Sequence, residues 1–219
     1  MAYGKRWAMA LTIATLLGSG HASAQRDDPD YPPVVPPPGT VVASPEALLT
    51  KLFGKPIGWI IKATGDLNGD GRDDWAGVVQ WDASSVNQAQ LFILLQRADG
   101  TFVLTEQSRA SDTYRAGVED LTIEDRGVLT LQYSVSCSAT CHAGVKLHYK
   151  FYKGAWTLVG SDEESFETDS QAETRYSTNF LTGRTVTDVM ASNGKVASST
   201  VGHTDKRPAL LQDVSVFGN

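Results

Sequence analysis

Cysteines, basic residues and long apolar runs are all scarce in this chain of 219 residues. It has two cysteines, so at most one disulfide can form within the chain. Its 19 lysines and arginines are outnumbered by 25 acidic residues, a balance that argues against nucleic acid and anionic membranes as partners. No apolar run reaches the roughly 20 residues of a transmembrane helix. These shortages suit a soluble, exported protein.

The first 24 residues have the layout of a secretory signal peptide. Lys5 and Arg6 precede an apolar stretch of about ten residues from Trp7, which closes on Ala22-Ser23-Ala24, an A-x-A cleavage pattern. A membrane anchor is the alternative, although the stretch is short for a span. We expect cleavage after Ala24, which leaves a periplasmic or secreted protein of 195 residues with no later membrane insertion.

Cleavage would also change the charge of the protein. The segment 1–24 carries two basic residues and no acidic one, so the exported chain is expected to have a net charge of −8. This charge would favour encounter with a basic partner, or it would only keep the protein soluble.

Residues 25–40 hold six of the nine prolines of the chain. Proline fixes φ and lacks a backbone donor, so this stretch cannot build a helix or a central strand. We predict a semi-extended linker, with recognition by a proline-binding partner as the alternative. Residues 41–219 then form one domain with enough chain for a substantial core.

One short helix is predicted near the start of this domain, in SPEALLTKLF at 44–53. Ser44 is a good N-cap, and Pro45 suits the first helical position. The leucines at 48, 49 and 52 give an apolar stripe at helical spacing. We therefore expect a helix that serves packing and carries no chemistry.

The rest of the domain predicts strands. Apolar, β-branched and aromatic runs occupy 57–63, 75–81 and 90–97. Hairpin turns are predicted at Asp99-Gly100, at 124–127 and at Lys153-Gly154. We expect a mainly β, antiparallel sheet domain, short and propeller-like or similar to lysozyme inhibitors, with one short N-terminal helix. The polar C-terminal stretch, 191–219, predicts loops with a weak last strand.

Residues 66–74, DLNGDGRDD, have the spacing of a calcium-binding loop. We expect calcium to bind the side chains at alternate positions and one main-chain carbonyl, which gives the ligands Asp66, Asn68, Asp70, Arg72 (carbonyl) and Asp74. An EF-hand needs Glu at position twelve, where this chain has Gly77. The loop therefore joins two strands, and the metal would be structural. A metal-free turn whose side chains satisfy backbone donors is the alternative.

Cys137 and Cys141 predict a disulfide, because an even pair in an exported protein is usually oxidised. A zinc site that uses both cysteines and His142 is the alternative, but it lacks a fourth ligand at a convincing spacing.

Catalytic motifs are missing. His148 and His203 lie apart from any serine or carboxylate motif that would suggest a triad, and no nucleophile elbow is present. The acidic run 161–170 could offer a carboxylate pair, but it is more typical of a solvated loop. We therefore expect that the protein is not an enzyme.

Residues 173–186, ETRYSTNFLTGRTV, have the composition of an adaptable binding loop: tyrosine, small hydroxyls, an amide, glycine and arginine. A plain β-turn at Thr182-Gly183 is the alternative. If the segment binds, its tip would offer donors from Thr182, the Gly183 backbone and Arg184. Tyr176 and Asn179 would brace it, and Gly183 would allow close main-chain approach or a positive φ.

The order of these features resembles known families. The DxNxDGxxD loop resembles those of the FG-GAP/VCBS calcium-binding repeats. Over roughly residues 57–185 the chain resembles periplasmic immunity proteins paired with lysozyme-like effectors of the xanthomonad type IV secretion system. Those proteins are similar in fold to periplasmic i-type lysozyme inhibitors and carry a calcium loop.

The resemblance implies a β-sheet domain that plugs the cleft of a lysozyme-like glycoside hydrolase with a surface loop. We therefore expect a calcium-stabilised periplasmic inhibitor or immunity protein whose inhibitory loop contains Tyr176, Asn179, Thr182, Gly183 and Arg184. The alternative is a calcium-binding adhesion or scaffold module without inhibitory activity.

Overall fold

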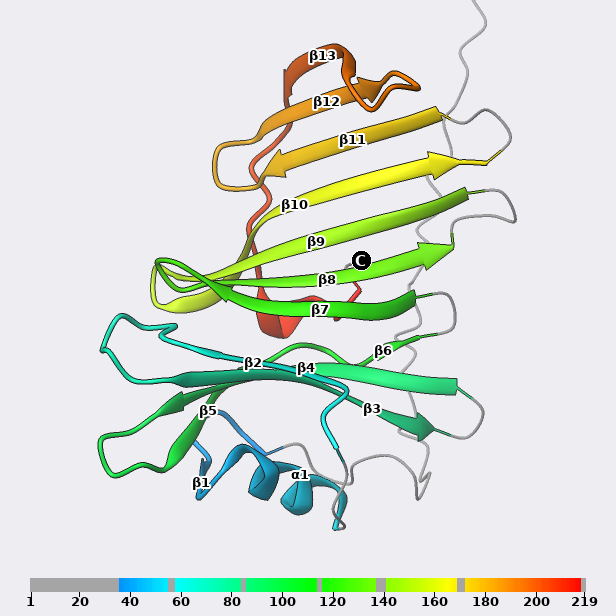
Figure 1. The fold of residues 1–219 in the computed structure, drawn as a ribbon. Helices are drawn as coiled ribbons and strands as arrows, with labels where there is room; N and C mark the ends of the chain where they lie inside the picture. The colour runs from blue at the N-terminus through cyan, green and yellow to red at the C-terminus, as the bar shows by residue number, and fades with distance from the viewer. Residues whose placement is uncertain are drawn as a thin grey trace, which may run out of the picture.

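The computed structural model describes residues 36–54, 58–83, 86–113, 116–136, 141–168 and 172–217. These residues form two antiparallel sheets and one α-helix (Figure 1). The expectation of a mainly β domain with a short N-terminal helix is thereby confirmed. The predicted signal peptide and most of the proline-rich segment lie outside the described residues. Within the described part of the chain, no helix has the length and hydropathy to cross a bilayer.

The first sheet has six strands in the order β1-β5-β4-β3-β2, with β6 beside β4. Their bounds are β1 (Val41–Val42), β2 (Ile61–Gly65), β3 (Asp74–Ala83), β4 (Val86–Gln96), β5 (Phe102–Gln107) and β6 (Ser111–Asp112). The sheet is a meander of hairpins, so neighbouring strands in space are mostly neighbours in the chain.

The second sheet has eight strands in the order β13-β12-β11-β10-β9-β8-β7, with β14 beside β10. Their bounds are β7 (Ala116–Glu124), β8 (Val128–Ser136), β9 (Cys141–Tyr152), β10 (Ala155–Glu167), β11 (Ala172–Asn179), β12 (Arg184–Met190), β13 (Val196–His203) and β14 (Ala209–Leu210). A short 3-10 helix, η1 (Leu211–Asp213), follows β14.

Helix α1 (Pro45–Phe53) begins and ends where its sequence predicts. The Ser44 hydroxyl accepts a hydrogen bond from the Ala47 amide at 3.2 Å, which caps the N-terminus. Gly54 ends the helix in the left-handed conformation with φ of 64°. The predicted leucine stripe is buried and packs on the six-stranded sheet.

Two apolar cores lie on the two faces of the six-stranded sheet. Along β3, Trp75 and Val79 pack toward α1, whereas Ala76 and Val78 pack toward the eight-stranded sheet. A sheet that is covered on both faces needs apolar residues at nearly every position. This explains why β3 and β4 each contain an unbroken run without polar residues, WAGVV at 75–79 and LFILL at 91–95, instead of a strict alternation. The fold is therefore three layers deep at this point: helix, sheet and sheet (Figure 1).

The C-terminal segment ties the two sheets together. Leu211, Val214 and Val216 are buried in the core between the sheets. The Val214 carbonyl accepts a hydrogen bond from the Arg109 amide at 2.8 Å, on the side of the six-stranded sheet. From the eight-stranded sheet, the Tyr133 hydroxyl donates to the Phe217 carbonyl at 2.6 Å.

Three strands of the eight-stranded sheet extend past the core. Strands β11, β12 and β13 rise away from the six-stranded sheet (Figure 1). All residues of β11 are exposed or half-buried, and seven of the eight residues of β13 are exposed. On the strands that do cover the core, alternate residues point inward, and the others form the outer face, which is turned away from the six-stranded sheet.

Strand β13 corrects the expectation that residues 191–219 form loops with one weak strand. It runs for eight residues and pairs with β12 through a hairpin around Asn193 and Gly194. Gly194 has φ of 73°, and Asn193 accepts a hydrogen bond from the Lys195 amide at 3.0 Å. The strand lacks apolar alternation because neither of its faces is buried, so hydropathy could not show it. The three hairpins that the sequence predicted, at Asp99-Gly100, at 124–127 and at Lys153-Gly154, are present.

Candidate functional site

The predicted calcium loop is a tight turn built around Asp66. The Asp66 carboxylate accepts hydrogen bonds from the backbone amides of Gly69 at 2.7 Å, Asp70 at 3.1 Å and Gly71 at 2.8 Å. The bond from Gly71 is the main reason that the pKa of Asp66 lies below its usual value, because these amides stabilise the charged form. The alternating acidic spacing therefore orders this loop through its own backbone.

Asn68 and Asp70 extend the network. The Asn68 side-chain amide donates to the Asp70 carboxylate at 2.9 Å, and the same carboxylate forms an ion pair with Arg72. The Arg72 guanidinium also donates to the Gln96 carbonyl at 3.0 Å. Its side chain therefore spans from the loop to the end of β4. One turn therefore carries three side chains with oxygen atoms of the kind that calcium prefers as ligands: Asp66, Asn68 and Asp70.

Asp74 has a different role in this structure from that of an open ligand. It is fully buried, and its two carboxylate oxygens accept hydrogen bonds from the Leu67 amide at 2.9 Å and the Gln96 amide at 2.8 Å. Burial raises the pKa of Asp74, against the opposing effect of these two bonds. The side chain fastens the end of the loop to β4.

Among the described residues, no group of three or more histidine, cysteine, aspartate or glutamate side chains gathers as a metal site. Calcium binding by this loop therefore stays a prediction that rests on its motif and on the oxygen donors of Asp66, Asn68 and Asp70.

The predicted inhibitory loop falls on the hairpin turn between β11 and β12. The Asn179 side chain accepts hydrogen bonds from the amides of Leu181 at 3.1 Å and Thr182 at 3.0 Å. The Thr182 hydroxyl accepts one from the Arg184 amide at 3.2 Å. The turn is therefore held in one shape by its own polar side chains.

Gly183 has φ of 77° and is buried against the chain that follows β13. Its carbonyl accepts a hydrogen bond from the Thr204 amide at 2.8 Å, and a Cβ at Gly183 would lie 2.2 Å from the Thr204 carbonyl oxygen. Gly183 therefore needs to be glycine, both for its positive φ and for a close main-chain contact. That contact is with Thr204 of the protein itself and not with a partner.

The five predicted loop residues do not all lie together. Asn179, Thr182, Gly183 and Arg184 share the turn, whereas Tyr176 lies within β11, opposite Glu163 and Thr187 in register. Tyr176 and Asn179 are three residue steps apart along the strand, which is about 10 Å. The exposed tip therefore consists of Thr182 and Arg184.

The predicted disulfide falls partly outside the described residues. Cys137 lies outside them. Cys141 is the first residue of β9. The pairing of the two cysteines stays a prediction.

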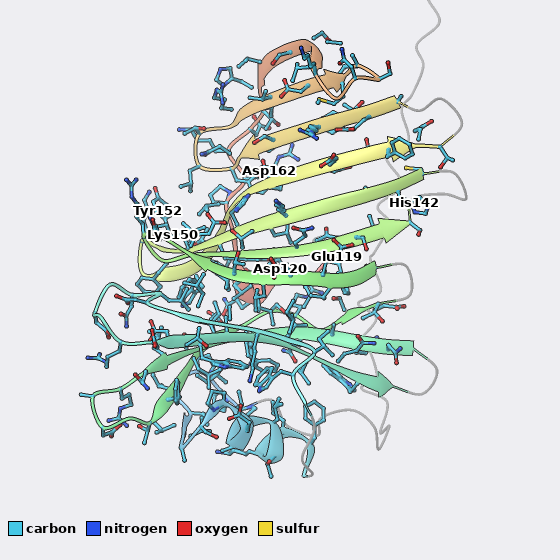
Figure 2. All side chains as sticks on the ribbon, viewed as in Figure 1. Glu119, Asp120, His142, Lys150, Tyr152 and Asp162 are labelled. Atoms are coloured by element: carbon cyan, nitrogen blue, oxygen red, sulfur yellow. The ribbon has the colours of Figure 1, made fainter. Side chains whose placement is uncertain are left out.

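A polar network that sequence analysis did not anticipate crosses the outer face of the eight-stranded sheet. His148 on β9 contacts Asp162 on β10, with 2.9 Å between Nε2 and the carboxylate, and Thr130 on β8, with 2.9 Å between Nδ1 and the hydroxyl. The Thr130 hydroxyl donates in turn to Glu124 at 2.5 Å. Figure 2 shows the position of Asp162 on this sheet.

The Thr130 hydroxyl, His148 and Asp162 have the order of a catalytic triad. The direction of the hydrogen bond from Thr130 does not fit nucleophilic catalysis. A nucleophile must give its proton to the histidine, whereas the Thr130 hydroxyl donates to Glu124. Thr130 is also buried, at 6% exposure, where no substrate carbonyl can reach it. The network is an arrangement of charges and hydrogen bonds that fixes the outer face.

Asp162 is the acidic end of this network. Partial burial raises its pKa, but hydrogen bonds from Ser177 and His148 and the positive charge of Lys146 outweigh burial, so the pKa of Asp162 lies below its usual value. The carboxylate is therefore held in its charged form.

Comparisons of the chain with protein-family models, with curated proteins and with solved structures find no match. The resemblance to lysozyme-inhibitor-type immunity proteins accordingly rests on the motifs in this sequence.

Proposed function

We propose that this chain is an exported, non-enzymatic protein that blocks a lysozyme-like peptidoglycan hydrolase with the turn between β11 and β12. The observation that carries the proposal is the geometry of the turn: Asn179 fixes it from within, and Thr182 and Arg184 are exposed at its tip. A loop that is ordered before binding loses less conformational entropy when it enters a cleft.

The chemistry of the tip suits the target. Lysozyme-like hydrolases work with two carboxylates that flank the scissile bond. A blocking loop therefore needs donors at its tip. The Arg184 guanidinium forms no ion pair with another described residue. The Thr182 hydroxyl, which accepts from the Arg184 amide, still has its own proton to donate.

The position of the turn suits insertion. It joins two strands of the part of the eight-stranded sheet that extends past the core (Figure 1). A cleft can therefore close around the turn without meeting the six-stranded sheet. The acidic charge expected for the exported chain would draw in a basic enzyme surface, so association should slow as salt rises.

The predicted calcium loop would have a structural role in such an inhibitor. The loop joins β2 and β3 of the six-stranded sheet and packs on the turn between β7 and β8, so it is not part of β11–β13. Calcium bound there would stabilise the domain without touching the target enzyme.

Inhibition of peptidoglycan lysis tests the proposal directly. The purified protein is titrated against a panel of lysozyme-like hydrolases, and the double variant Thr182→Ala/Arg184→Ala is titrated beside it. Truncating a buried arginine–carboxylate contact typically costs about 2–5 kcal/mol, so inhibition should weaken by at least tenfold. The matched control is Arg97→Ala/Thr101→Ala, which removes the same residue types from another exposed hairpin turn, between β4 and β5.

The control variant should inhibit like the parent, and all three proteins should remain folded at the temperature of the assay. If no hydrolase is inhibited, or if both double variants inhibit as well as the parent, the turn does not enter a cleft. The chain would then be better described as a binding module of the adhesion or scaffold type.

A further inference from the structure

A hollow of about 280 Å³ lies on the outer face of the eight-stranded sheet, across β9, β10, β11 and β12. Its lining includes Gly144, Lys146, Asp162, Arg175 and Asp188. These residues are distinct from the tip of the β11–β12 turn, so this outer-face hollow is a separate feature from the proposed inhibitory site.

The hollow exists because Gly144 has no side chain. Gly144 pairs with Ser134 on one side and with Glu164 on the other, in the middle of the sheet. A Cβ built at Gly144 would find no atom within 4 Å. Glycine usually weakens a strand, because it packs nothing and loses more entropy on folding. No close contact in the structure requires glycine here, so the opening itself is the feature that glycine provides.

The walls of the hollow are charged groups whose positions are fixed by neighbours. The Arg175 guanidinium binds Glu164 at 3.2 Å and Glu173 at 2.9 Å. The Asp162 carboxylate is held by His148 at 2.9 Å and by the Ser177 hydroxyl. Polar side chains that are already held in place lose little conformational entropy when a ligand binds, which is a property of preorganised binding sites.

Three charged side chains in the lining have no ion-pair partner among the described residues: Lys146, Glu163 and Asp188. Glu163 pairs in register with the core residue Val145, so it lies on the inner face of the sheet, and only the Lys146 ammonium and the Asp188 carboxylate are on the outer face. They lie on opposite sides of the hollow, on β9 and β12. We infer that the outer-face hollow binds a short peptide with free ends, whose carboxylate meets Lys146 and whose ammonium meets Asp188.

The spacing of the strands sets the length of this ligand. Lys146 and Asp188 are separated by three strand intervals and by two residues along the strands, which puts their backbones about 16 Å apart. An extended peptide spans about 3.4 Å per residue, so two to four residues bridge the hollow once the two side chains lean inward. A single amino acid is too short to reach both charges, and the volume is too small for a folded partner.

Binding of trialanine with free ends tests the inference. The ¹⁵N-labelled protein is titrated with trialanine, with N-acetyl-trialanine and with trialanine amide, and backbone amide shifts are followed by NMR. The unblocked peptide should move the amides of β9–β12 around the hollow. Each blocked peptide should bind at least tenfold more weakly, because one charge pair is lost.

Gly144→Val is the decisive variant. Its side chain would fill open space in a strand, where β-branched residues are favoured, so the protein should fold at least as well as the parent. Binding of trialanine should fall by at least tenfold. Gly117→Val is the matched control: Gly117 lies on β7 in register with Ser134, outside the hollow, and its Cβ would approach only the Ser134 hydroxyl, at 3.9 Å.

The inference is overturned if trialanine causes no shifts around the hollow, if the blocked peptides bind as well as the free one, or if Gly144→Val binds like Gly117→Val. Because the hollow and the turn use different residues, loss of peptide binding in Gly144→Val leaves the inhibition assay as an independent result.

Discussion

The carbonyl oxygen of Leu67 lies 2.3 Å from the place that a Cβ at Gly127 would occupy. Leu67 belongs to the predicted calcium loop, and Gly127 is in the turn between β7 and β8, which starts the eight-stranded sheet. The loop of one sheet is therefore packed directly on the hairpin of the other. Any event that orders the loop will also strengthen the junction between the sheets.

Gly127→Ala should destabilise the protein. Gly127 has φ of 69°, so alanine there meets backbone strain as well as the Leu67 carbonyl. Gly154→Ala separates the two effects, because Gly154 has φ of 89° in a hairpin turn but no atom within 4 Å of its Cβ position. We expect Gly154→Ala to cost about 1 kcal/mol and Gly127→Ala clearly more, measured by urea unfolding. If both variants lose the same free energy of unfolding, the Leu67 carbonyl moves aside for the added methyl group without a measurable cost.

Calcium should raise the melting temperature of the folded protein. A ligand that binds only the native state adds about 2.7 kcal/mol of stability at a hundredfold excess over its Kd. Extracellular calcium modules bind at about 10⁻⁴–10⁻³ M, so the effect should appear in millimolar calcium and vanish with chelator. Asp70→Ala should abolish the difference. Asp99→Ala, in another exposed aspartate–glycine turn, should keep it.

If the melting temperature in chelator equals that in millimolar calcium, the loop does not bind calcium, and its side chains serve only to form hydrogen bonds within the loop. The structure shows that such bonds exist, since Asp66 alone accepts three backbone amides.

Asp74→Asn should lower the free energy of unfolding, although it replaces only one carboxylate oxygen with an NH₂ group. Both oxygens of Asp74 accept backbone amides in a fully buried position. Asparagine can accept at only one of these atoms and turns an NH₂ group toward the other amide. Leaving a buried donor unsatisfied costs about 1–3 kcal/mol, which urea unfolding at pH 7 can measure. Asp73→Asn, at the exposed neighbouring position, should change stability by less than about 0.5 kcal/mol.

The elements that the sequence predicted correctly are those with local signals. Ser44 caps α1, and Asp99-Gly100 and Lys153-Gly154 turn their hairpins, because capping and positive φ depend on neighbouring residues alone. The turn around Asn179 was found for the same reason. Asn193-Gly194 carries an equally local turn signal, and it could have predicted β13 despite the strand's lack of apolar alternation.

The interactions that were missed depend on register between strands. The hairpin at Lys153-Gly154 pairs Tyr149 with Leu158, but an irregularity between Leu158 and Gly160 shifts the pairing by one residue beyond that point. The shift is what places Asp162 on the same face as His148. Counting back from the turn would have put Ser161 there. The burial of Asp74 is likewise set by β4, over twenty residues away along the chain.

Acid should remove the stability that the Asp162 carboxylate contributes to the folded protein. Asp162 has a pKa below its usual value in the folded protein, so its ionised form is stabilised by folding. Stability of this kind is fully present above the unfolded pKa, about 3.9, and is lost as pH falls through the lower folded pKa. Asp162→Asn should therefore be less stable than the parent at pH 5 to 7, and the difference should shrink below about pH 4. Because the Asp162 side chain is 49% exposed, the difference should stay below about 1 kcal/mol.

Urea unfolding of both proteins between pH 7 and pH 2.5 measures this difference. Asp188→Asn is the matched control, since Asp188 lies on the same outer face but forms no ion pair with another described residue. Asp188→Asn should cost less stability at pH 7 than Asp162→Asn, because it breaks no ion pair. The double variant His148→Gln/Asp162→Asn should lose less stability than the sum of the losses of the two single variants, because the two residues share one interaction. A constant gap between the parent and Asp162→Asn down to pH 2.5 would mean that the loss comes from packing, and that the contacts of Asp162 with His148 and Ser177 do not stabilise its charge.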